Sequence, residues 1–450
     1  MTGPRTDRGR VLLILGLATA VTVFTATVPL LRDWFDLRVY YGAVNTWMHH
    51  GGRLYDYQVP GTTYGFTYPP FAAVSMLPMT LVGLHTAIAL ALLLNLAALA
   101  LVLHYLTEGA WRRYGWYGCA LGACVLALFE PLRDTLSFGQ VNLLLLALVL
   151  TDAWLLRTGR ERWAGVGIGL AVAIKLTPAV FIGLLLVARR WRAAAVATAV
   201  TGAATGLAAV VAPDASRFYW TEALWDTNRV GRLDYVSNQS LQGILARLGI
   251  TDRPVWALAV LLVLGVWAWR SGRAVAAGDW AAAFALTGLT ACLVSPITWV
   301  HHLVWLLPSF AVLIRTGHPR VAGTLYTVLC TSVVWLWFHD ASGIDGFLGS
   351  NIYAWITLGL LLWLPTGQLP AARAALARST SATAPAPSAA AAAMNPVSAQ
   401  PGPPSGATAA ATGTASGPGL GLTRSASKDP TGATRPAAAN PQSSRSRASS

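Results

Sequence analysis

Two carboxylates stand where the first long apolar run of the chain ends. Asp33 and Asp36 follow the apolar residues 11–31 and lie in a stretch, 33–41, that also carries four aromatic rings. A carboxylate in this place can act as a general base, and a pair of them is the set that glycosidases use. A carboxylate here can also cap a helix, and Asp33 is the better candidate for the cap. Asp36 is therefore our candidate catalytic base.

Lys175 is the one lysine inside an apolar run, since the only other lysine, Lys428, is close to the C-terminus. It lies in the middle of residues 163–188, far from the arginines that flank this run on both sides. A charge placed inside a membrane costs at least a few kcal/mol, so such residues are retained for function. We expect Lys175 to bind an anion, the alternative being a side chain that reaches out to the membrane surface.

A histidine pair, His301 and His302, follows the sequence Ser-Pro-Ile-Thr-Trp-Val at residues 295–300. Neighbouring residues on a helix point about 100° apart, so the two rings seldom bind one metal ion. A second histidine at metal-ligand spacing and a carboxylate cluster are both missing from the neighbouring sequence. We expect one of the two to bind phosphate or hydroxyl groups and expect no metal. Interfacial histidines beside a tryptophan are the alternative.

Amide and guanidinium groups collect in the segments between the apolar runs. Arg229 and Arg232 lie in one such segment, Asn238 and Gln239 follow shortly after, and Gln140 lies at the start of another apolar run. These groups suit phosphate and sugar hydroxyls. An ordinary solvated loop, or a helix cap in the case of Gln140, is the alternative.

The composition identifies a polytopic membrane protein. Of the 450 residues, 55% are hydrophobic and only 11% are charged, whereas charged residues make up about a quarter of soluble domains. The net charge of +14 does not indicate nucleic-acid binding, because the arginines sit in small clusters between apolar runs, as the positive-inside rule predicts. The four cysteines fall inside apolar runs without a metal-binding spacing, so we expect them to pack in the protein interior.

Arginine clusters fix a topology of ten crossings in an all-α fold. Arginines near the N-terminus place residues 1–10 in the cytoplasm, so the first helix leads outward. Twelve of the eighteen acidic residues then fall on the external side, which indicates a working surface there. The expected parts are a cytoplasmic segment 1–10, a transmembrane catalytic domain 11–365 with external loops 32–66 and 213–253, an external turn at 130–134, and a tail 380–450.

Two apolar segments and the tail do not fit regular spans. Residues 66–83 are interrupted by three prolines, and residues 163–188 have arginines at both ends and a break at Thr177 and Pro178. We expect both to be re-entrant or surface segments, the second consisting of two half-helices with Lys175 deep in the protein. Residues 380–450, rich in Ala, Ser, Pro and Gly, lack the apolar side chains for a core, so we expect a disordered cytoplasmic tail.

Seven motifs in a fixed order make the chain resemble glycosyltransferase family 87, the polyprenyl-phosphate-mannose-dependent α-1,2-mannosyltransferases of actinobacteria. The resemblance covers residues 33–364 and leaves out the tail. The motifs are Asp-Leu-Arg-Val-Tyr (36–40), Phe-Thr-Tyr-Pro-Pro-Phe-Ala (66–72), Glu-Pro-Leu-Arg (130–133), Phe-Gly-Gln-Val-Asn (138–142), Lys-Leu-Thr-Pro (175–178), Asn-Gln-Ser (238–240) and Ser-Pro-Ile-Thr-Trp-Val-His-His (295–302).

This resemblance implies a GT-C membrane fold of about 10–12 transmembrane helices with re-entrant segments. The implied reaction is an inverting transfer of mannose from polyprenyl-phosphate-mannose to a hydroxyl of a lipid-anchored or cell-envelope mannoside, at the outer face of the plasma membrane. The partners would be the lipid-linked donor, a glycolipid or lipoglycan acceptor and membrane lipids. The lipid-linked sugar is then a co-substrate, and no cofactor is expected.

The resemblance also assigns roles to individual residues. Asp36 stands where the family has its catalytic aspartate, which deprotonates the acceptor hydroxyl. A larger set would bind the donor phosphate or its sugar, with one histidine of the pair on the phosphate: Lys175, Arg229, His301, His302, Gln140 and Asn238. Further candidates for contacts with the acceptor or sugar are Tyr40, Tyr68, Glu130, Arg133 and Gln239.

Two other functions remain open at this point. The same chemistry with another lipid-linked sugar, such as arabinose, would use the same motifs, because the donor sugar is selected by pocket shape. A lipid or solute transporter would carry polar residues at mid-membrane in several helices. In this chain Lys175 is nearly alone there and the polar motifs gather at the external ends of the spans, which favours the enzyme.

Overall fold

A computed structural model describes residues 6–27, 33–107 and 109–367 of the chain. In these residues the fold is helical throughout, and the β-pairing amounts to one isolated bridge between Gln58 and Gly65. The expected cytoplasmic residues 1–5 and the expected tail 380–450 lie outside the described residues. The expectation of an all-α fold is confirmed.

The α-helices range from 7 to 24 residues in length. In chain order the α-helices are α1 (Asp7–Thr27), α2 (Phe35–His49), α3 (Pro70–Met76), α4 (Leu84–Leu106), α5 (Ala110–Leu126), α6 (Glu130–Phe138), α7 (Asn142–Arg157), α8 (Val166–Ile174), α9 (Ala179–Val187), α10 (Trp191–Val211), α11 (Pro213–Thr221), α12 (Leu241–Arg247), α13 (Arg253–Ala276), α14 (Trp280–Val294), α15 (Leu307–Arg315), α16 (Pro319–Cys330), α17 (Gly343–Ser350) and α18 (Ile352–Trp363). The 3-10 helices are η1 (Leu77–Leu81), η2 (Glu161–Trp163), η3 (Ala223–Trp225), η4 (Thr227–Arg229), η5 (Val300–Leu306) and η6 (Val333–Trp337).

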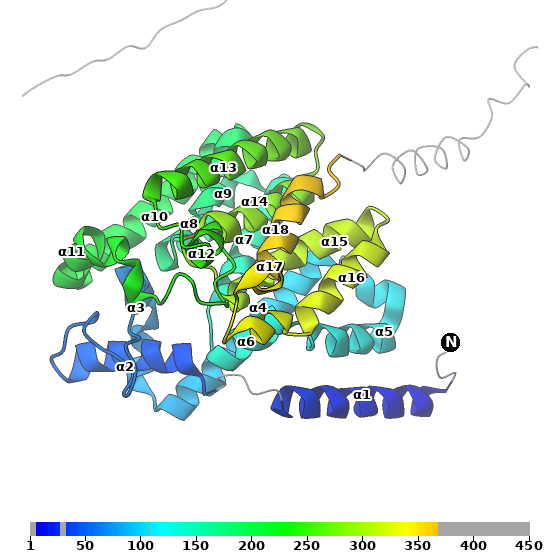
Figure 1. The fold of residues 1–450 in the computed structure, drawn as a ribbon, viewed down its shortest axis with the longest axis horizontal. Helices are drawn as coiled ribbons and strands as arrows, with labels where there is room; N and C mark the ends of the chain where they lie inside the picture. Colours follow the sequence, from blue (N-terminus) through cyan, green and yellow to red (C-terminus); the bar gives the residue numbers. More distant parts are fainter. Residues whose placement is uncertain (1–5, 28–32, 108, 368–450) are drawn as a thin grey trace, which may run out of the picture. The chain divides into compact units, whose positions relative to one another are not determined.

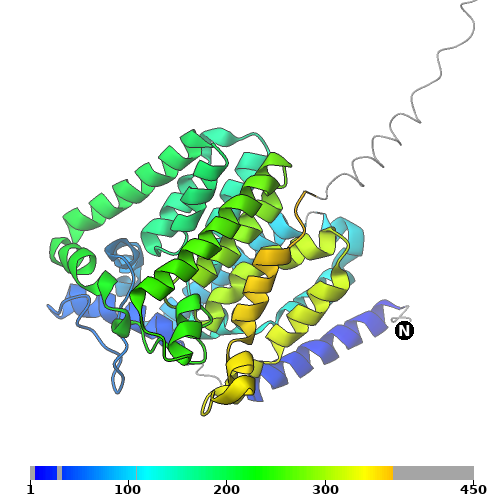
Figure 2. The same cartoon turned by 45° about the horizontal axis from the view of Figure 1, so that its top comes forward.

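Three long helices, α4, α10 and α13, are long and apolar enough to cross a membrane. Two bent pairs, α5 with α6 and α17 with α18, raise the number among the described residues to five if each pair is one span. Each long helix packs along a more buried neighbour: α13 along α14, α10 along α8, and α4 along α7 (Figures 1 and 2). The chain is a polytopic membrane protein.

Fewer helices meet this length criterion than the ten crossings expected from the arginine pattern, because several of the expected spans are short. The helices α7 and α14 have 16 and 15 residues. Twelve residues of α14 are buried, on all sides of the helix, as is typical of a helix surrounded by protein. The shorter helices of the bundle therefore include its most enclosed ones.

The expectation of a turn at 130–134 is wrong, because these residues begin the nine-residue helix α6. Pro131 lies in its first turn, where the missing N–H does no harm. The helix bends by 77° from the preceding helical segment and buries its first six residues. It ends at Gly139, whose φ of 70° is the left-handed conformation that terminates helices.

Both expected interruptions occur in the structure. Residues 66–83 contain only the short helices α3 and η1. The run 163–188 is divided into α8 and α9, and Lys175 is the residue that ends α8, with extended backbone angles of −148° and 129°. The prediction of two half-helices is confirmed. The break turns Lys175 out of the helical repeat and leaves its ammonium group available to other elements.

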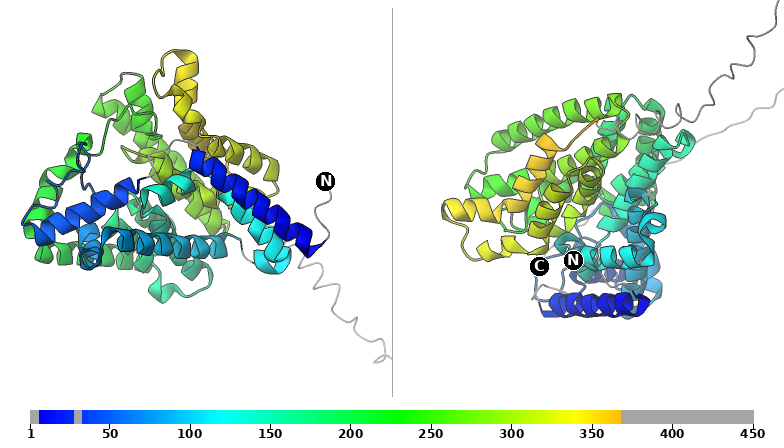
Figure 3. Two further views of the ribbon diagram at one scale, coloured as in Figure 1. Left: turned by 90° about the horizontal axis from the view of Figure 1, so that it is seen from below. Right: turned by 90° about the vertical axis from the view of Figure 1, so that its right-hand side faces the viewer.

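The N-terminal helix α1 packs against α5, where Arg10 lies over the ring of Tyr117 at 5.4 Å (Figure 3). The segment that joins α1 to α2, residues 28–32, lies outside the described residues. The helix α2 contacts α3, η1, α4 and α6. Its first turn is thereby held beside the end of α6, which brings Asp36 next to Gln140.

Gly139 is the residue that lets α2 approach α6. A Cβ atom at this position would lie 2.7 Å from Cβ of Leu37, and φ is positive. We predict that Gly139→Ala lowers the free energy of unfolding by about 1–3 kcal/mol, through left-handed backbone strain and overpacking. Gly122→Ala is the matched control, because a Cβ there has no neighbour within 4 Å. Thermal unfolding of the purified protein in detergent measures both, and equal stability of the two variants would contradict the prediction.

Candidate active site

The start of α2 turns Asp36 inward and leaves Asp33 outside. Trp34, in a left-handed conformation with φ of 53°, precedes the helix, and no side chain caps it. Asp33 is exposed and pairs with Arg38 instead, with Nη2 of Arg38 donating to Oδ1 at 2.8 Å. The expectation that Asp33 caps this helix is wrong. Its carboxylate is engaged by the arginine two residues past Asp36, so only Asp36 is directed at the polar interior.

Seven residues from five segments form one polar group, which we call the Asp36 cluster: Asp36, Tyr40, Tyr68, Gln140, Asn142, Lys175 and His302. Gln140 joins its two halves. Its side chain is a hydrogen-bond partner of Asp36, and its Oε1 accepts from the hydroxyl of Tyr68 at 2.9 Å. The Tyr68 hydroxyl in turn accepts from Tyr40 at 3.0 Å. The two tyrosines and Gln140 are buried, whereas Asp36 keeps part of its surface accessible.

Lys175 is the cationic end of the Asp36 cluster. Its Nζ donates to Oδ1 of Asn142 at 3.1 Å and to the Tyr68 hydroxyl at 3.4 Å, and lies 2.8 Å from Nε2 of His302. It also lies over the Tyr68 ring, 5.1 Å from the centroid. Asn142 was part of a motif in the sequence but was not among the expected site residues. Its amide completes the set by donating to the carbonyl of His301 at 3.3 Å.

The contact between Lys175 and His302 brings two donors together. Nδ1 of His302 accepts from the backbone N–H of Trp299 at 3.1 Å. A neutral imidazole has one donor and one acceptor nitrogen, so its Nε2 carries the proton and faces Lys175. A protonated ammonium group has only donors as well. An anionic oxygen near this pair would accept from both, which makes the position suited to a phosphate.

Asp36 has an altered affinity for protons. Burial raises its pKa from 3.8 to about 6, and the hydrogen bond from Gln140 and the charge of Lys175 oppose this increase. The carboxylate therefore accepts a proton more readily than a solvated aspartate near neutral pH, where it is still mostly ionised. Such a pKa is the one that general-base catalysis requires.

His301 packs against α6. Its carbonyl accepts from Thr135 at 3.0 Å, and its ring packs edge-on against Phe138 at 5.5 Å. The two neighbouring rings are at 83° to each other. Of the two histidines expected in the site, the structure brings His302 into the Asp36 cluster and uses the backbone of His301 to hold the turn on α6 and α7.

Asn238 and Gln239 contact the backbone before the histidine pair, outside the Asp36 cluster. Asn238 is fully buried; its Oδ1 accepts from the N–H of Thr298 at 2.9 Å and its Nδ2 donates to the carbonyl of Pro296 at 3.2 Å. The backbone N–H of Gln239 donates to the carbonyl of Thr298 at 2.7 Å. The side chain of Gln239 bonds to Val236, Ser350 and Ala354. The two residues thus fix the turn that carries His302.

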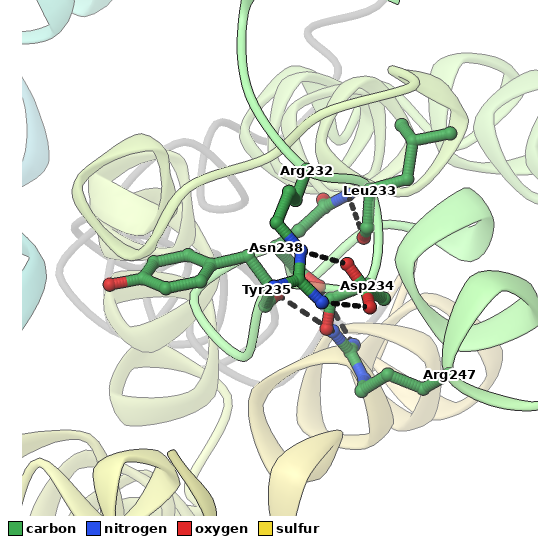
Figure 4. Close-up of polar contacts among 6 residues, drawn as sticks. All are labelled: Arg232, Leu233, Asp234, Tyr235, Asn238 and Arg247. Atoms are coloured by element: carbon green, nitrogen blue, oxygen red, sulfur yellow. Dashed lines mark hydrogen bonds and ion pairs between the residues drawn. The ribbon is translucent and has the colours of Figure 1, made fainter. Parts of the chain in front are cut away.

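Arg247 secures this segment in turn, although nothing in the sequence singled it out. Its guanidinium group donates to the carbonyls of Tyr235 at 2.9 Å and Asn238 at 2.8 Å (Figure 4). Its Nε also donates to Asn351 at 3.0 Å. Burial lowers its pKa to about 10. Beside it, Arg232 forms an exposed ion pair with Asp234 at 2.7 Å. These arginines hold the loop rather than line the Asp36 cluster.

Glu130 and Arg133 form a second buried group, separate from the Asp36 cluster. Glu130 accepts from the hydroxyl of Tyr353 and from Nε1 of Trp335, and Arg133 donates to Ser332 at 2.9 Å. The carboxylate of Glu130 is fully buried. These contacts join α6 to η6 and α18, and the structure places the two residues outside the Asp36 cluster.

Arg229 is also outside the Asp36 cluster. Its Nη2 donates to the carbonyl of Tyr55 at 2.6 Å, and its guanidinium group lies 5.2 Å from the centre of the Phe218 ring. It lines a neighbouring pocket that Phe66 borders as well. Phe66 in turn packs edge-on against Tyr40 and Tyr68, so the pocket and the Asp36 cluster share a wall.

In the described ranges, no three His, Cys, Asp or Glu side chains are grouped so that they could hold a metal ion. The Asp36 cluster thus has a carboxylate at one end and the amine of Lys175 at the other, linked by Gln140 and Tyr68.

The chain is similar in sequence to known glycosyltransferases. The model of glycosyltransferase family 87 matches residues 66–296, slightly more than half of the chain. The polyprenol-phosphate-mannose-dependent alpha-(1-2)-phosphatidylinositol pentamannoside mannosyltransferase of Mycobacterium tuberculosis (strain CDC 1551) is 34% identical over 350 residues, which are 74% of this chain and 79% of the relative. The chain belongs to glycosyltransferase family 87.

A second relative supports this membership. The polyprenol-phosphate-mannose-dependent alpha-(1-2)-phosphatidylinositol mannoside mannosyltransferase of Mycolicibacterium smegmatis is 33% identical over 371 residues, 77% of this chain and 76% of the relative. No solved structure matches the chain. The resemblance to family 87 inferred from seven motifs is confirmed, and the chain is a glycosyltransferase.

In this family 87 chain, the side chain of Asn238 bonds to the backbone of the turn before the histidine pair. We predict that Asn238→Ala lowers the free energy of unfolding by about 1–3 kcal/mol, because it leaves the buried N–H of Thr298 without its acceptor and removes one of the two donors to the carbonyl of Pro296. Asn95→Ala is the matched control, since Asn95 is also buried but its Nδ2 donates to the carbonyl of Ala91 in its own helix. Thermal unfolding in detergent compares the two. A loss from Asn238→Ala no larger than that from Asn95→Ala would contradict this role.

Proposed function

We propose that the chain is an inverting mannosyltransferase, which moves mannose from polyprenyl-phosphate-mannose to a hydroxyl of a lipid-anchored or cell-envelope mannoside and forms an α-1,2 linkage. The single observation that carries this proposal is the pairing, in one cluster, of a partly buried carboxylate with the facing donors of Lys175 and His302. The relatives named above use polyprenol-phosphate-mannose, which supports the choice of donor.

In the proposed reaction Asp36 removes the proton from the acceptor hydroxyl as that oxygen attacks the anomeric carbon of the β-linked donor. The new bond joins this carbon to the acceptor oxygen, and the bond to the phosphate oxygen breaks on the opposite face, which gives the α-product. The lipid phosphate leaves with the electron pair of that bond and needs no proton. One base is therefore sufficient, and a second carboxylate has no step to perform.

Lys175 and Nε2 of His302 hold the phosphate in this proposal. They are charged or polar donors in a site that excludes most water, where they stabilise the negative charge that develops on the departing phosphate. Asn142 holds the ammonium group at 3.1 Å, and Trp299 fixes the imidazole by donating to Nδ1. Neither interaction has to form during the reaction, so the stabilisation costs little reorganisation.

Gln140, Tyr68 and Tyr40 connect the two ends of the proposed site. Gln140 bonds to Asp36 on one side and to Tyr68 on the other, so it keeps the base at a fixed distance from the cation. These three groups also present amide and hydroxyl functions to a sugar placed between base and phosphate. We propose that this site lies at the external face of the plasma membrane and that residues 380–450 are in the cytoplasm. The reaction as proposed uses no cofactor.

We predict that Asp36→Asn lowers kcat by about 10²–10⁴-fold, the contribution of a general base. Asp33→Asn is the control, because its carboxylate is exposed and paired with Arg38, and we expect it to retain activity. Transfer of labelled mannose from polyprenyl-phosphate-mannose to a mannoside acceptor, at equal protein amounts, measures both. Full activity of Asp36→Asn removes Asp36 from the mechanism. Transfer from polyprenyl-phosphate-arabinose alone would show that mannose is not the donor sugar.

The pH dependence of kcat/KM reports the same carboxylate. Asp36 is active when ionised, and its pKa is raised to about 6, so we predict that activity falls as the pH drops through about 6. Gln140→Leu removes a hydrogen bond that lowers this pKa, so the acid limb of the profile should move to higher pH. A profile that stays flat down to about pH 4, the ordinary range of a solvated aspartate, would contradict a buried base.

A further inference from the structure

A polar pocket of about 220 Å³ adjoins the Asp36 cluster. Its walls come from two segments, residues 55–66 and 226–229, and Phe66 separates it from Tyr40 and Tyr68 at ring distances of 6.2 Å and 6.1 Å. Pockets for drug-sized ligands have roughly 300–1,000 Å³, so this one suits a group the size of a single sugar ring.

The pocket is fixed to the helix that carries the base. Tyr57, one of its lining residues, lies against Gly42 of α2, so closely that a Cβ at Gly42 would overlap the tyrosine hydroxyl. The hydroxyl of Tyr55 donates to the carbonyl of Tyr68 at 2.8 Å. One of its tyrosines is thus packed on α2, which carries Asp36, and another is bonded to Tyr68 of the Asp36 cluster.

The lining residues favour a neutral polyol over a phosphate. Arg229 is held by the carbonyl of Tyr55, and Asn228 and Gln58 add amides. A phosphate would be attracted by Arg229 but repelled by Asp226, whose carboxylate lines the same pocket and accepts from the N–H of Asn228 at 3.1 Å. Hydroxyl groups both donate and accept, so they satisfy the carboxylate, the amides and the guanidinium together.

We propose that this pocket binds a neutral sugar residue of the acceptor, next to the one whose hydroxyl is activated by Asp36. The inference rests on the proposed function, because it deepens the description of the acceptor. It replaces the donor-phosphate role expected for Arg229 from the sequence with a role on the acceptor side. A consequence is that an acceptor of two sugars binds more tightly than an acceptor of one.

Transfer to two neutral acceptors tests this pocket with the purified full chain in detergent. The acceptors are methyl α-mannoside and a methyl α-linked dimannoside, and the donor is polyprenyl-phosphate-mannose with a labelled sugar. We expect Asn228→Ala and Gln58→Ala each to raise KM for the dimannoside about tenfold, since each removes about one hydrogen bond. KM for the monosaccharide and for the donor should not change. Arg53→Ala is the control, because Arg53 is exposed and is not among the residues that line the pocket.

Three results would overturn the proposal. One is an unchanged KM for the dimannoside in both pocket variants. Another is a raised KM of these variants for mannose 6-phosphate as the acceptor with an unchanged KM for the dimannoside, which would make the pocket a phosphate site.

A wild-type chain that transfers no mannose at all would contradict the proposed function but not the pocket. In that case calorimetric binding of the dimannoside tests the pocket separately. Weaker binding to Asn228→Ala supports it, and equal binding to wild type and variant overturns it.

Discussion

The ammonium group of Lys175 is the charge on which the arrangement of the site depends. A cation inside a membrane protein needs acceptors, and Asn142 and Tyr68 supply them to Lys175 from distant parts of the chain, while His302 faces it with a donor. None of these three side chains is an anion. The charge of Asp36, at the other end of the cluster, also acts on it. In the proposed reaction the lipid phosphate supplies the missing negative charge, so binding of the donor and stabilisation of the buried cation are the same interaction.

The fold provides for this charge through irregular backbone. The break between α8 and α9 frees Lys175 from the helical repeat, and the 3-10 helix η5 turns His302 toward it. The side chain of Asn238 bonds to the backbone of the turn before η5, and Arg247 donates to the carbonyl of Asn238. Residues far from the reaction thus decide where the imidazole lies.

The sequence predicted the elements of this site better than their contacts. The half-helices around Lys175 followed from arginines on both sides and from a proline, which are local signals. Asn238 and Gln239 were expected to contact a ligand, because an amide bonds equally well to a sugar and to a carbonyl and only the fold brings Pro296 and Thr298 beside them. Asp33 was expected to cap a helix, but Arg38 engages it. The helix α6 looked like a turn, since nine residues are too few for a periodic pattern. Arg247 bonds to carbonyls in its own loop, which no motif marks.

The central claim is that Asp36 and the Lys175–His302 pair have separate tasks within one cluster, the first in catalysis and the second in donor binding. The most direct measurement is the dissociation constant of polyprenyl-phosphate-mannose for the wild-type chain, Lys175→Met and Asp36→Asn in the same detergent. The account predicts that Lys175→Met weakens donor binding at least tenfold while Asp36→Asn binds the donor as well as the wild type does or better, because removing its negative charge does not disfavour the phosphate. Equal donor binding by Lys175→Met and the wild type would contradict the account.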